Sequence, residues 1–276
     1  MNFPRILKKR KGYIDRIKPF MQKSVVKVLT GQRRVGKSFL LYQLIEEILA
    51  EEPDANIIYV NLEDFTFSSQ QTAEDLHSYI ISHSKEKAKN YIFIDEIQDI
   101  PGFEKVIRSL LLNEDNDIYI TGSNAKMLSG ELATYLSGRY IEFKIYSLSY
   151  SEFLEFHGLT ESETSYELYS RYGGLPYLLN LPLEDETVNE YLKSVYSTIV
   201  FRDVVSRYKL RNTLFLEKLI QFLSENIGNL FSAKNISDYL KSQHTTISVN
   251  QIQSYTEYLN LSLIHISEPT RPRLIS

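Results

Sequence analysis

An early segment of the chain combines glycines, a lysine and a hydroxyl in the spacing of a phosphate-binding loop. The run Gly31-Gln32-Arg33-Arg34-Val35-Gly36-Lys37-Ser38 fits the pattern G-x-x-x-x-G-K-[ST]. Its glycines let the loop curl so that several backbone N–H groups point at one anion, and the following helix adds partial positive charge. Lys37 would place a full charge near the β- and γ-phosphates, and the Ser38 hydroxyl would bind Mg²⁺. The segment therefore predicts a site for ATP and Mg²⁺.

Two adjacent acids follow an apolar stretch at a second position. Residues 91–94 run directly into Asp95 and Glu96. In open α/β sheets ligands bind at the carboxyl ends of the strands, so both carboxylates are expected beside the loop. Asp95 would hold Mg²⁺, directly or through water, and Glu96 would act as the general base on the attacking water. The acidic pair favours hydrolysis over phosphoryl transfer to a small acceptor.

Further polar residues are candidates for contact with the transferred phosphate. Ser123 and Asn124 follow the predicted strand 117–121, where one of them either senses the γ-phosphate or caps the next helix. Arg139 either stabilises the transition state, in cis or from a neighbouring subunit, or pairs with a surface acid. Arg33 and Arg34 either contact phosphate or an acid, or stay solvated.

The predicted site residues form three groups. The catalytic candidates are Glu96, Asn124 and Arg139. The metal-binding candidates are Ser38 and Asp95. The nucleotide-binding candidates are Gly31, Gln32, Arg33, Arg34, Val35, Gly36, Lys37, Ser38 and Phe39.

Hydrophobic patterning divides the chain into two parts. Up to about residue 148, strand-like and helix-like stretches alternate, which predicts a three-layer α/β fold with a mainly parallel sheet. The expected strands are residues 25–29, 56–62, 91–94, 117–121 and 140–145, and the expected helices are residues 38–50, 72–83, 102–112 and 124–136. After residue 148 helical spacing dominates. The helices expected there are residues 151–156, 161–171, 184–205, 214–226, 233–241 and 249–259.

With these pieces assembled, the chain resembles the prokaryotic AAA+-like ATPases in which an AAA domain precedes a DUF4143 region. The stretches that carry the resemblance are residues 29–38, Phe93-Ile94-Asp95-Glu96-Ile97-Gln98, Ile120-Thr121-Gly122-Ser123, Leu136-Ser137-Gly138-Arg139, Gly173-Gly174-Leu175-Pro176 and Phe201-Arg202-Asp203-Val204. The resemblance implies an ATPase domain over residues 1–148, a helical lid or linker over 149–210 and a partial winged-helix-like region over 211–260. Intact members have a further C-terminal domain, which this chain is too short to contain.

The C-terminal helices include a candidate DNA-binding surface. Residues 232–241 and 248–259 are a possible helix-turn-helix, and Ser248 with Gln251 fits a capping box. The polar residues considered for DNA contact are Lys234, Lys241, His244, Gln251 and Gln253. The alternative is an ordinary helical hairpin with a polar outer face. The basic run Lys8-Lys9-Arg10-Lys11 is either a solvated terminus or a contact to a nucleic-acid backbone.

Composition limits the other classes of protein. The 276 residues include no cysteine, which excludes disulfides and thiolate metal sites and fits a cytoplasmic protein. No signal-peptide pattern is present, and no apolar run approaches the roughly 20 residues of a membrane helix. A net charge of −4 requires any nucleic-acid surface to be a local patch. An arginine supplied by a neighbour would require a homo-oligomer.

Two functions use the same predicted site. The chain is expected to hydrolyse ATP and to couple turnover to a conformational change. The alternative is a nucleotide-gated regulator that binds DNA or protein and scarcely turns over.

The last residues are predicted to be non-native. Residues 261–271 read as the translation of a transposase-type sequencing adapter, and Ile275-Ser276 fits its continuation. The alternative is a genuine flexible terminus. Resequencing the genomic locus without that adapter decides between them, because only a genuine terminus would still be encoded there and followed by a stop codon.

Overall fold

The computed structural model describes residues 8–69, 71–123, 135–136, 138–226, 229–242 and 247–261. The chain forms two compact units, Met1–Asn189 and Glu190–Ser276. The boundary between them falls inside helix α8 (Asp185–Thr198). The domain boundaries expected at 148 and 210 stay predictions.

A five-stranded parallel sheet forms the centre of the first unit. Its strands are β1 (Val26–Thr30), β2 (Asn56–Asn61), β3 (Asn90–Asp95), β4 (Asn116–Gly122) and β5 (Tyr140–Lys144). Their order is β2-β3-β4-β1-β5, and every pairing is parallel. Strands β3 and β4 are buried along their whole length, which explains why they are mostly apolar rather than alternating. The predicted α/β class and all five predicted strands are confirmed.

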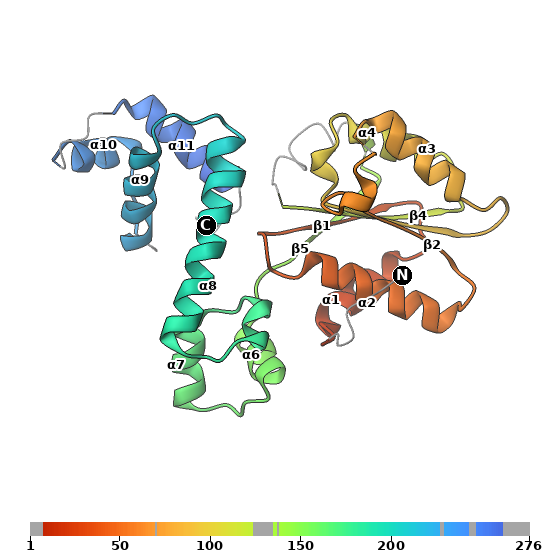
Figure 1. Cartoon of the computed structure of the whole chain (residues 1–276), viewed down its shortest axis with the longest axis horizontal. Coiled ribbons are helices and arrows are strands. Elements are labelled where there is room, and N and C mark those ends of the chain that lie inside the picture. The colour runs from red at the N-terminus through yellow and green to blue at the C-terminus, as the bar shows by residue number, and fades with distance from the viewer. Residues whose placement is uncertain are drawn as a thin grey trace, which may run out of the picture. The chain divides into compact units, whose positions relative to one another are not determined.

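Helices cover both faces of this sheet (Figure 1). On one face lie α1 (Lys11–Ile17) and α2 (Lys37–Glu51), and on the other lie α3 (Ala73–His83) and α4 (Phe103–Leu110). Successive strand residues point to opposite faces, so each strand contributes to two apolar cores. In β1, for example, Val28 joins the core with α3 and α4, whereas Leu29 joins the core with α1 and α2. Helix α1 was not expected from the sequence.

The first unit continues with helices after β5. They are α6 (Tyr150–His157), α7 (Glu163–Tyr172), the 3-10 helix η5 (Pro176–Asn180) and the start of α8. Ser149 and Glu152 form a capping box at the start of α6, and Gly158 ends that helix in the left-handed conformation. The helix expected over residues 124–136 lies almost entirely outside the described residues.

The second unit is helical throughout its described residues. Helix α8 runs into a π-helix, η6 (Ile199–Ser206), and is followed by α9 (Thr213–Glu225), α10 (Ala233–Ser242) and α11 (Val249–Leu261). An apolar core joins them. The capping box at α11 is confirmed, because Ser248 and Gln251 bond each other's backbone N–H groups. The wing of a winged helix is not confirmed by the described residues. In the described part of the chain, no helix is long and apolar enough to cross a bilayer.

Candidate nucleotide-binding site

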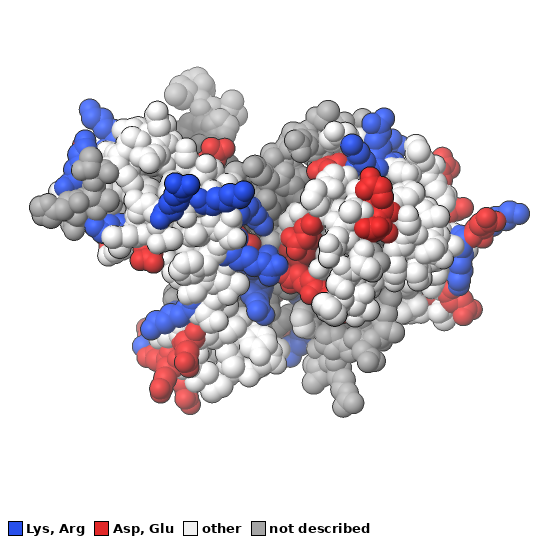
Figure 2. Space-filling model, turned by 45° about the horizontal axis from the view of Figure 1, so that its top comes forward, with Lys and Arg blue, Asp and Glu red and all other residues white. Residues whose placement is uncertain are grey.

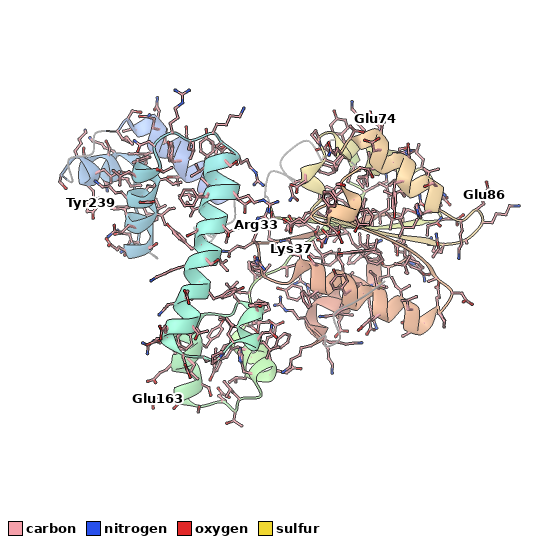
Figure 3. The ribbon with its side chains drawn as sticks, viewed as in Figure 1. Arg33, Lys37, Glu74, Glu86, Glu163 and Tyr239 are labelled. Carbon is pink, nitrogen blue, oxygen red and sulfur yellow. The ribbon has the colours of Figure 1, made fainter. Side chains whose placement is uncertain are left out.

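The predicted phosphate-binding loop connects the carboxyl end of β1 to the start of α2. Gly36 is the N-cap of α2 and has a left-handed backbone with φ of 95°. Gly31 passes so close to the chain after β5 that a Cβ there would lie 2.2 Å from the Ile145 carbonyl oxygen. Only glycine allows this approach. Figure 3 shows Lys37 at this end of the sheet, away from Glu86 at the other end.

The Lys37 ammonium lies inside the loop. The residue is buried, and its Nζ donates to the carbonyl oxygens of Gly31 at 3.0 Å and Gln32 at 3.2 Å. The same Nζ lies 3.5 Å from Oε1 of Glu96. The loop therefore holds a buried cation, which is the kind of group that pairs with phosphate oxygens.

Asp95 ends β3 and lies beside Ser38. Its carboxylate accepts hydrogen bonds from the hydroxyls of Ser38 and Thr121, and from Oη of Tyr59 at 3.2 Å. Burial raises the pKa of Asp95, and the Ser38 and Thr121 hydrogen bonds oppose that rise. A hydroxyl and a carboxylate are oxygen ligands of the kind Mg²⁺ takes when phosphates and waters complete its shell. The two predicted metal ligands are thus adjacent, and their chemistry fits the ion.

Glu96 follows Asp95 with a left-handed backbone, φ 56° and ψ 45°, which is uncommon for a residue other than glycine. Its carboxylate accepts a hydrogen bond of 2.6 Å from Nε2 of Gln98. Burial alone would raise the pKa of Glu96, but the Lys37 ammonium, the Gln98 hydrogen bond and the Arg33 guanidinium together hold that pKa below its ordinary value. Glu96 is therefore an ionised carboxylate in contact with the loop lysine.

Three residues that the sequence analysis did not assign to the site belong to it. The Thr121 hydroxyl donates to Asp95 and accepts the backbone N–H of Glu96 at 2.9 Å. Gln98 lies in the 3-10 helix η3 (Ile97–Asp99) and holds Glu96. Glu63 pairs with Arg33 at 3.0 Å, so this loop arginine contacts an acid. The only sequence signal for Thr121 was its position as a polar residue at the end of a predicted strand, and neither Gln98 nor Glu63 had such a signal.

Comparison with known proteins agrees with this geometry. Residues 23–154 match the AAA_14 family, whose description is an AAA domain. This part of the chain is therefore similar to an AAA domain. Residues 163–273 match DUF8612, a domain of unknown function, which corrects the DUF4143 assignment expected from the sequence. This second match extends into residues 261–273 and does not support their attribution to an adapter, which stays a prediction.

Two relatives share most of the chain, and both are described as uncharacterized. A protein of Haemophilus influenzae is 37% identical over 262 residues, covering 91% of this chain and 64% of the relative. A protein of Methanocaldococcus jannaschii is 32% identical over 248 residues, covering 85% of this chain and 54% of the relative. The chain therefore spans less than two thirds of either relative. Among solved structures, the Aeropyrum pernix ORC1 protein in complex with DNA aligns with a TM-score of 0.46 and 14% identity, covering 94% of this chain and 85% of that one.

The remaining candidates near the loop differ in how far their side chains are buried. Ser123 is buried beside Glu96, whereas Asn124 lies outside the described residues. Phe39, on the first turn of α2, is 47% exposed, and Arg34 is exposed with φ of 69°. Their roles in nucleotide binding stay predictions.

Arg139 lies at the opposite end of the sheet from the loop. Its carbonyl oxygen accepts the N–H of Val26 at 3.0 Å, at the amino end of β1 and β5. The loop begins at Gly31, five residues further along the strand, which is about 16 Å away. An arginine finger supplied in cis does not fit this arrangement, so the cis alternative is corrected. Supply from a neighbouring subunit stays a proposal.

A glycine-rich turn from far along the chain lies beside the phosphate-binding loop. Gly174 accepts the N–H of Leu148 at 2.7 Å, and a Cβ on Gly174 would collide with the Leu148 backbone. Pro176, two residues later, lies next to Gly36, because a Cβ built on Gly36 would be 3.7 Å from Cγ of Pro176. In the sequence this turn is one of the stretches that carry the family resemblance, and the structure places it beside the phosphate-binding loop.

Proposed function

We propose that the AAA domain binds Mg-ATP and hydrolyses it, with Glu96 as the general base. The observation that carries the proposal is that a buried lysine, an ionised glutamate and an adjacent serine–aspartate pair meet at the carboxyl edge of one parallel sheet. Phosphoryl transfer needs positioning and charge stabilisation, and these groups supply both.

Each group has a distinct role in the proposal. Backbone N–H groups of the loop and the Lys37 ammonium receive the phosphates. Ser38 and Asp95 would hold Mg²⁺, which neutralises phosphate charge when bound. Glu96 accepts the proton of the attacking water.

In this proposal the strength of Glu96 as a base depends on whether nucleotide is bound. Lys37 is the strongest of the influences that lower the pKa of Glu96, and a lowered pKa makes a weaker base. Phosphate oxygens that engage the Lys37 ammonium would weaken its pull on the carboxylate. The pKa of Glu96 would then rise towards the working pH when ATP is bound, so the base strengthens when its substrate is present.

The test replaces Glu96 by glutamine, which keeps the shape and removes the base. Glu96→Gln is expected to bind Mg-ATP with nearly unchanged affinity and to hydrolyse it at least about 100-fold more slowly. Calorimetry measures binding and phosphate release measures turnover. Glu86→Gln is the matched control, because Glu86 is exposed at the opposite end of the sheet. If Glu96→Gln keeps the hydrolysis rate of the unchanged chain, Glu96 is not the base.

A nucleotide-gated switch with little turnover is the second candidate. It is favoured by the contacts of Glu96, which is held by Gln98 and Lys37 and is a weak base in that state. Steady-state hydrolysis by the intact parent protein, with and without double-stranded DNA, separates the two. Turnover that stays near zero in both conditions, despite tight Mg-ATP binding, supports the switch.

The second unit is the part proposed to contact DNA. Among its described residues, Lys and Arg outnumber Asp and Glu by eight to six, and Figure 2 shows blue side chains gathered on this unit. The predicted contacts are only partly available, because Lys241 lies 3.5 Å from Asp238 and Gln251 caps α11. His244 lies outside the described residues. DNA binding that weakens steeply with salt would support a contact through this unit.

A further inference from the structure

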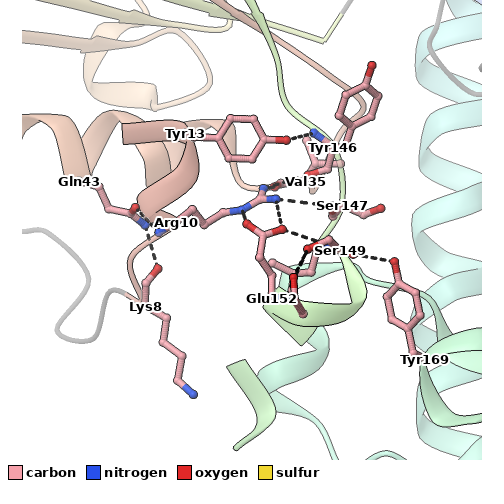
Figure 4. Close-up of polar contacts among 12 residues, drawn as sticks. Lys8, Arg10, Tyr13, Val35, Gln43, Tyr146, Ser147, Ser149, Glu152 and Tyr169 are labelled. Atoms are coloured by element: carbon pink, nitrogen blue, oxygen red, sulfur yellow. Dashed lines mark hydrogen bonds and ion pairs between the residues drawn. The ribbon is translucent and has the colours of Figure 1, made fainter. Parts of the chain in front are cut away.

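Arg10 is an arginine buried inside the first unit, with 4% of its surface exposed. It belongs to the basic run for which the sequence analysis offered a solvated terminus or a nucleic-acid contact. The structure contradicts both alternatives for Arg10, whereas Lys8, Lys9 and Lys11 are exposed. Lys9 pairs with Glu47 on α2 at 2.6 Å, and the Arg10 side chain points inward (Figure 4).

The Arg10 guanidinium uses all of its nitrogens. Nε and Nη2 each donate to one Glu152 carboxylate oxygen at 2.8 Å, which makes a two-point contact. Nη1 donates to the carbonyl oxygens of Tyr146 at 2.9 Å and Val35 at 3.3 Å, and Nη2 reaches the Ser147 carbonyl at 3.5 Å. A planar fork with five N–H donors can make this set of contacts, whereas a lysine ammonium cannot.

These acceptors belong to three different parts of the fold. Val35 lies in the phosphate-binding loop. Tyr146 lies in the connection that leaves β5. Glu152 lies in the first turn of α6, where its carboxylate also accepts the N–H of Ser149 at 2.9 Å. One side chain therefore contacts the loop, the connection and the first helix of the segment that follows.

Arg10 is itself held by the helix that starts at the loop. Its backbone N–H donates to Oε1 of Gln43 on α2 at 2.9 Å, and Nε2 of Gln43 donates to the Lys8 carbonyl at 3.0 Å. The Tyr13 ring centre lies 4.5 Å from Cζ of Arg10, and Oη of Tyr13 accepts the Tyr146 N–H at 3.0 Å. Gln43 therefore holds the backbone of Arg10, and the Tyr13 ring packs against the guanidinium.

We propose that Arg10 is a positioning residue that couples the phosphate-binding loop to the helical segment of residues 149–180. This inference rests on the proposed binding of Mg-ATP by the loop. The segment meets the loop at two points, through Arg10 at Val35 and through Pro176 beside Gly36. Nucleotide that orders the loop would therefore also order α6 and the connection before it, and loss of the fork would uncouple the two.

Hydrogen exchange of the intact chain with and without Mg-ATP tests the coupling. In the unchanged chain, Mg-ATP is expected to slow exchange in residues 31–38 and also in residues 145–157. In Arg10→Lys, which keeps the charge and loses the fork, residues 31–38 are expected to remain protected by nucleotide. Protection of residues 145–157 by nucleotide is expected to fall by at least about tenfold, since a lost charge-assisted hydrogen bond is worth about 1.5–3 kcal/mol. For each segment, the ratio of the exchange rates without and with Mg-ATP is compared between the variants. A uniform loss of stability therefore does not mimic the effect.

The matched control is Arg16→Lys. Arg16 is exposed on α1, and its Cζ lies 5.8 Å from the same Tyr13 ring. Its replacement is expected to leave nucleotide protection of both segments unchanged. Glu152→Gln is the second variant and is used whether or not Arg10→Lys folds. Glutamine retains the helix cap and removes the charge that Arg10 contacts, so it should reduce protection in residues 145–157 only.

The possible outcomes separate this inference from the function on which it rests. No protection of residues 31–38 in the unchanged chain would count against ATP binding by the loop. Protection of those residues without any in residues 145–157 would overturn the coupling. The coupling would also be overturned if Glu152→Gln, or a folded Arg10→Lys, kept the full nucleotide effect in both segments.

Discussion

At Glu96 the backbone takes a left-handed conformation that costs a non-glycine residue of order 1–3 kcal/mol. It is held there by the hydrogen bond from its N–H to Thr121 and by the contacts of its carboxylate with Lys37 and Gln98. Strain of this kind persists where the surroundings over-determine it, and such places are often functional. At the scale of single residues, the site is therefore organised around one turn of the chain after β3.

Lys37 is predicted to carry much of the affinity for Mg-ATP. Lys37→Ala removes the cation closest to the expected phosphates, so affinity should fall about 10- to 100-fold, the equivalent of one lost charge-assisted hydrogen bond. Calorimetric titration with Mg-ATP measures the change. Lys105→Ala, which removes an exposed lysine from α4, is the control. Equal affinities in Lys37→Ala and in the unchanged chain would remove Lys37 from the binding site.

His157 is predicted to make the first unit sensitive to mild acid. Burial lowers the pKa of His157 from its ordinary 6.5, and the nearby Lys8 ammonium lowers it further. Its Nε2 is buried without a hydrogen-bond partner in the part of the chain that the structure describes. The folded chain therefore binds fewer protons at His157 than the unfolded chain does. The free energy of unfolding is therefore at its full value above about pH 6.5, and this contribution is lost as pH falls through the lowered pKa.

The measurement is the melting temperature at pH 7.5 and pH 5.5. The drop between the two should be smaller in His157→Gln than in the unchanged chain, because glutamine does not titrate. His77→Gln, at a partly exposed histidine on α3, should show the unchanged drop. A drop of the same size in His157→Gln would mean that His157 does not contribute to acid sensitivity.

At the scale of elements, β3 and β4 are joined at their carboxyl ends by the Thr121 hydroxyl. Thr121→Val keeps the shape and leaves both the Asp95 carboxylate and the Glu96 N–H without that partner. Because both groups are buried, the free energy of unfolding should fall by about 1–3 kcal/mol. Urea unfolding measures this loss.

Thr121→Ser is the matched control because it keeps the hydroxyl and removes only a methyl group. It should lose clearly less stability than Thr121→Val. Equal losses in the two variants would show that packing of the methyl group, rather than the hydrogen bonds, is what Thr121 contributes.

At the scale of the whole molecule, the first unit holds its loop and Arg139 at opposite ends of the same sheet. An arginine in that position can serve a nucleotide only in a second copy of the chain. We therefore predict that hydrolysis depends on self-association, and that Arg139→Ala lowers it by at least about tenfold, since a lost contact to a charged group is worth about 1.5–3 kcal/mol. Phosphate release at increasing protein concentration measures both effects.

Mixing of variants tests the origin of the arginine. Arg139→Ala retains an intact loop and Lys37→Ala retains the arginine, so mixed assemblies should recover part of the activity that each variant lacks alone. Arg108→Ala, at an exposed arginine on α4, should remain active by itself. Mixtures that stay as inactive as their components would argue against supply from a neighbour.

The sequence by itself determined the elements and the chemistry of the loop, because both are local. Short apolar runs located β1 to β5, a spacing of 3.6 residues located most helices, and the run from Gly31 to Ser38 carries its own phosphate-binding geometry. Only the tertiary structure decided which distant groups meet. The Thr121 hydroxyl reaches Asp95 across 26 residues, and Glu152 meets Arg10 across 142. A basic run looks solvated in sequence because burial of a charge is costly without a partner. Folding supplies the partner for Arg10, and no local spacing indicates it.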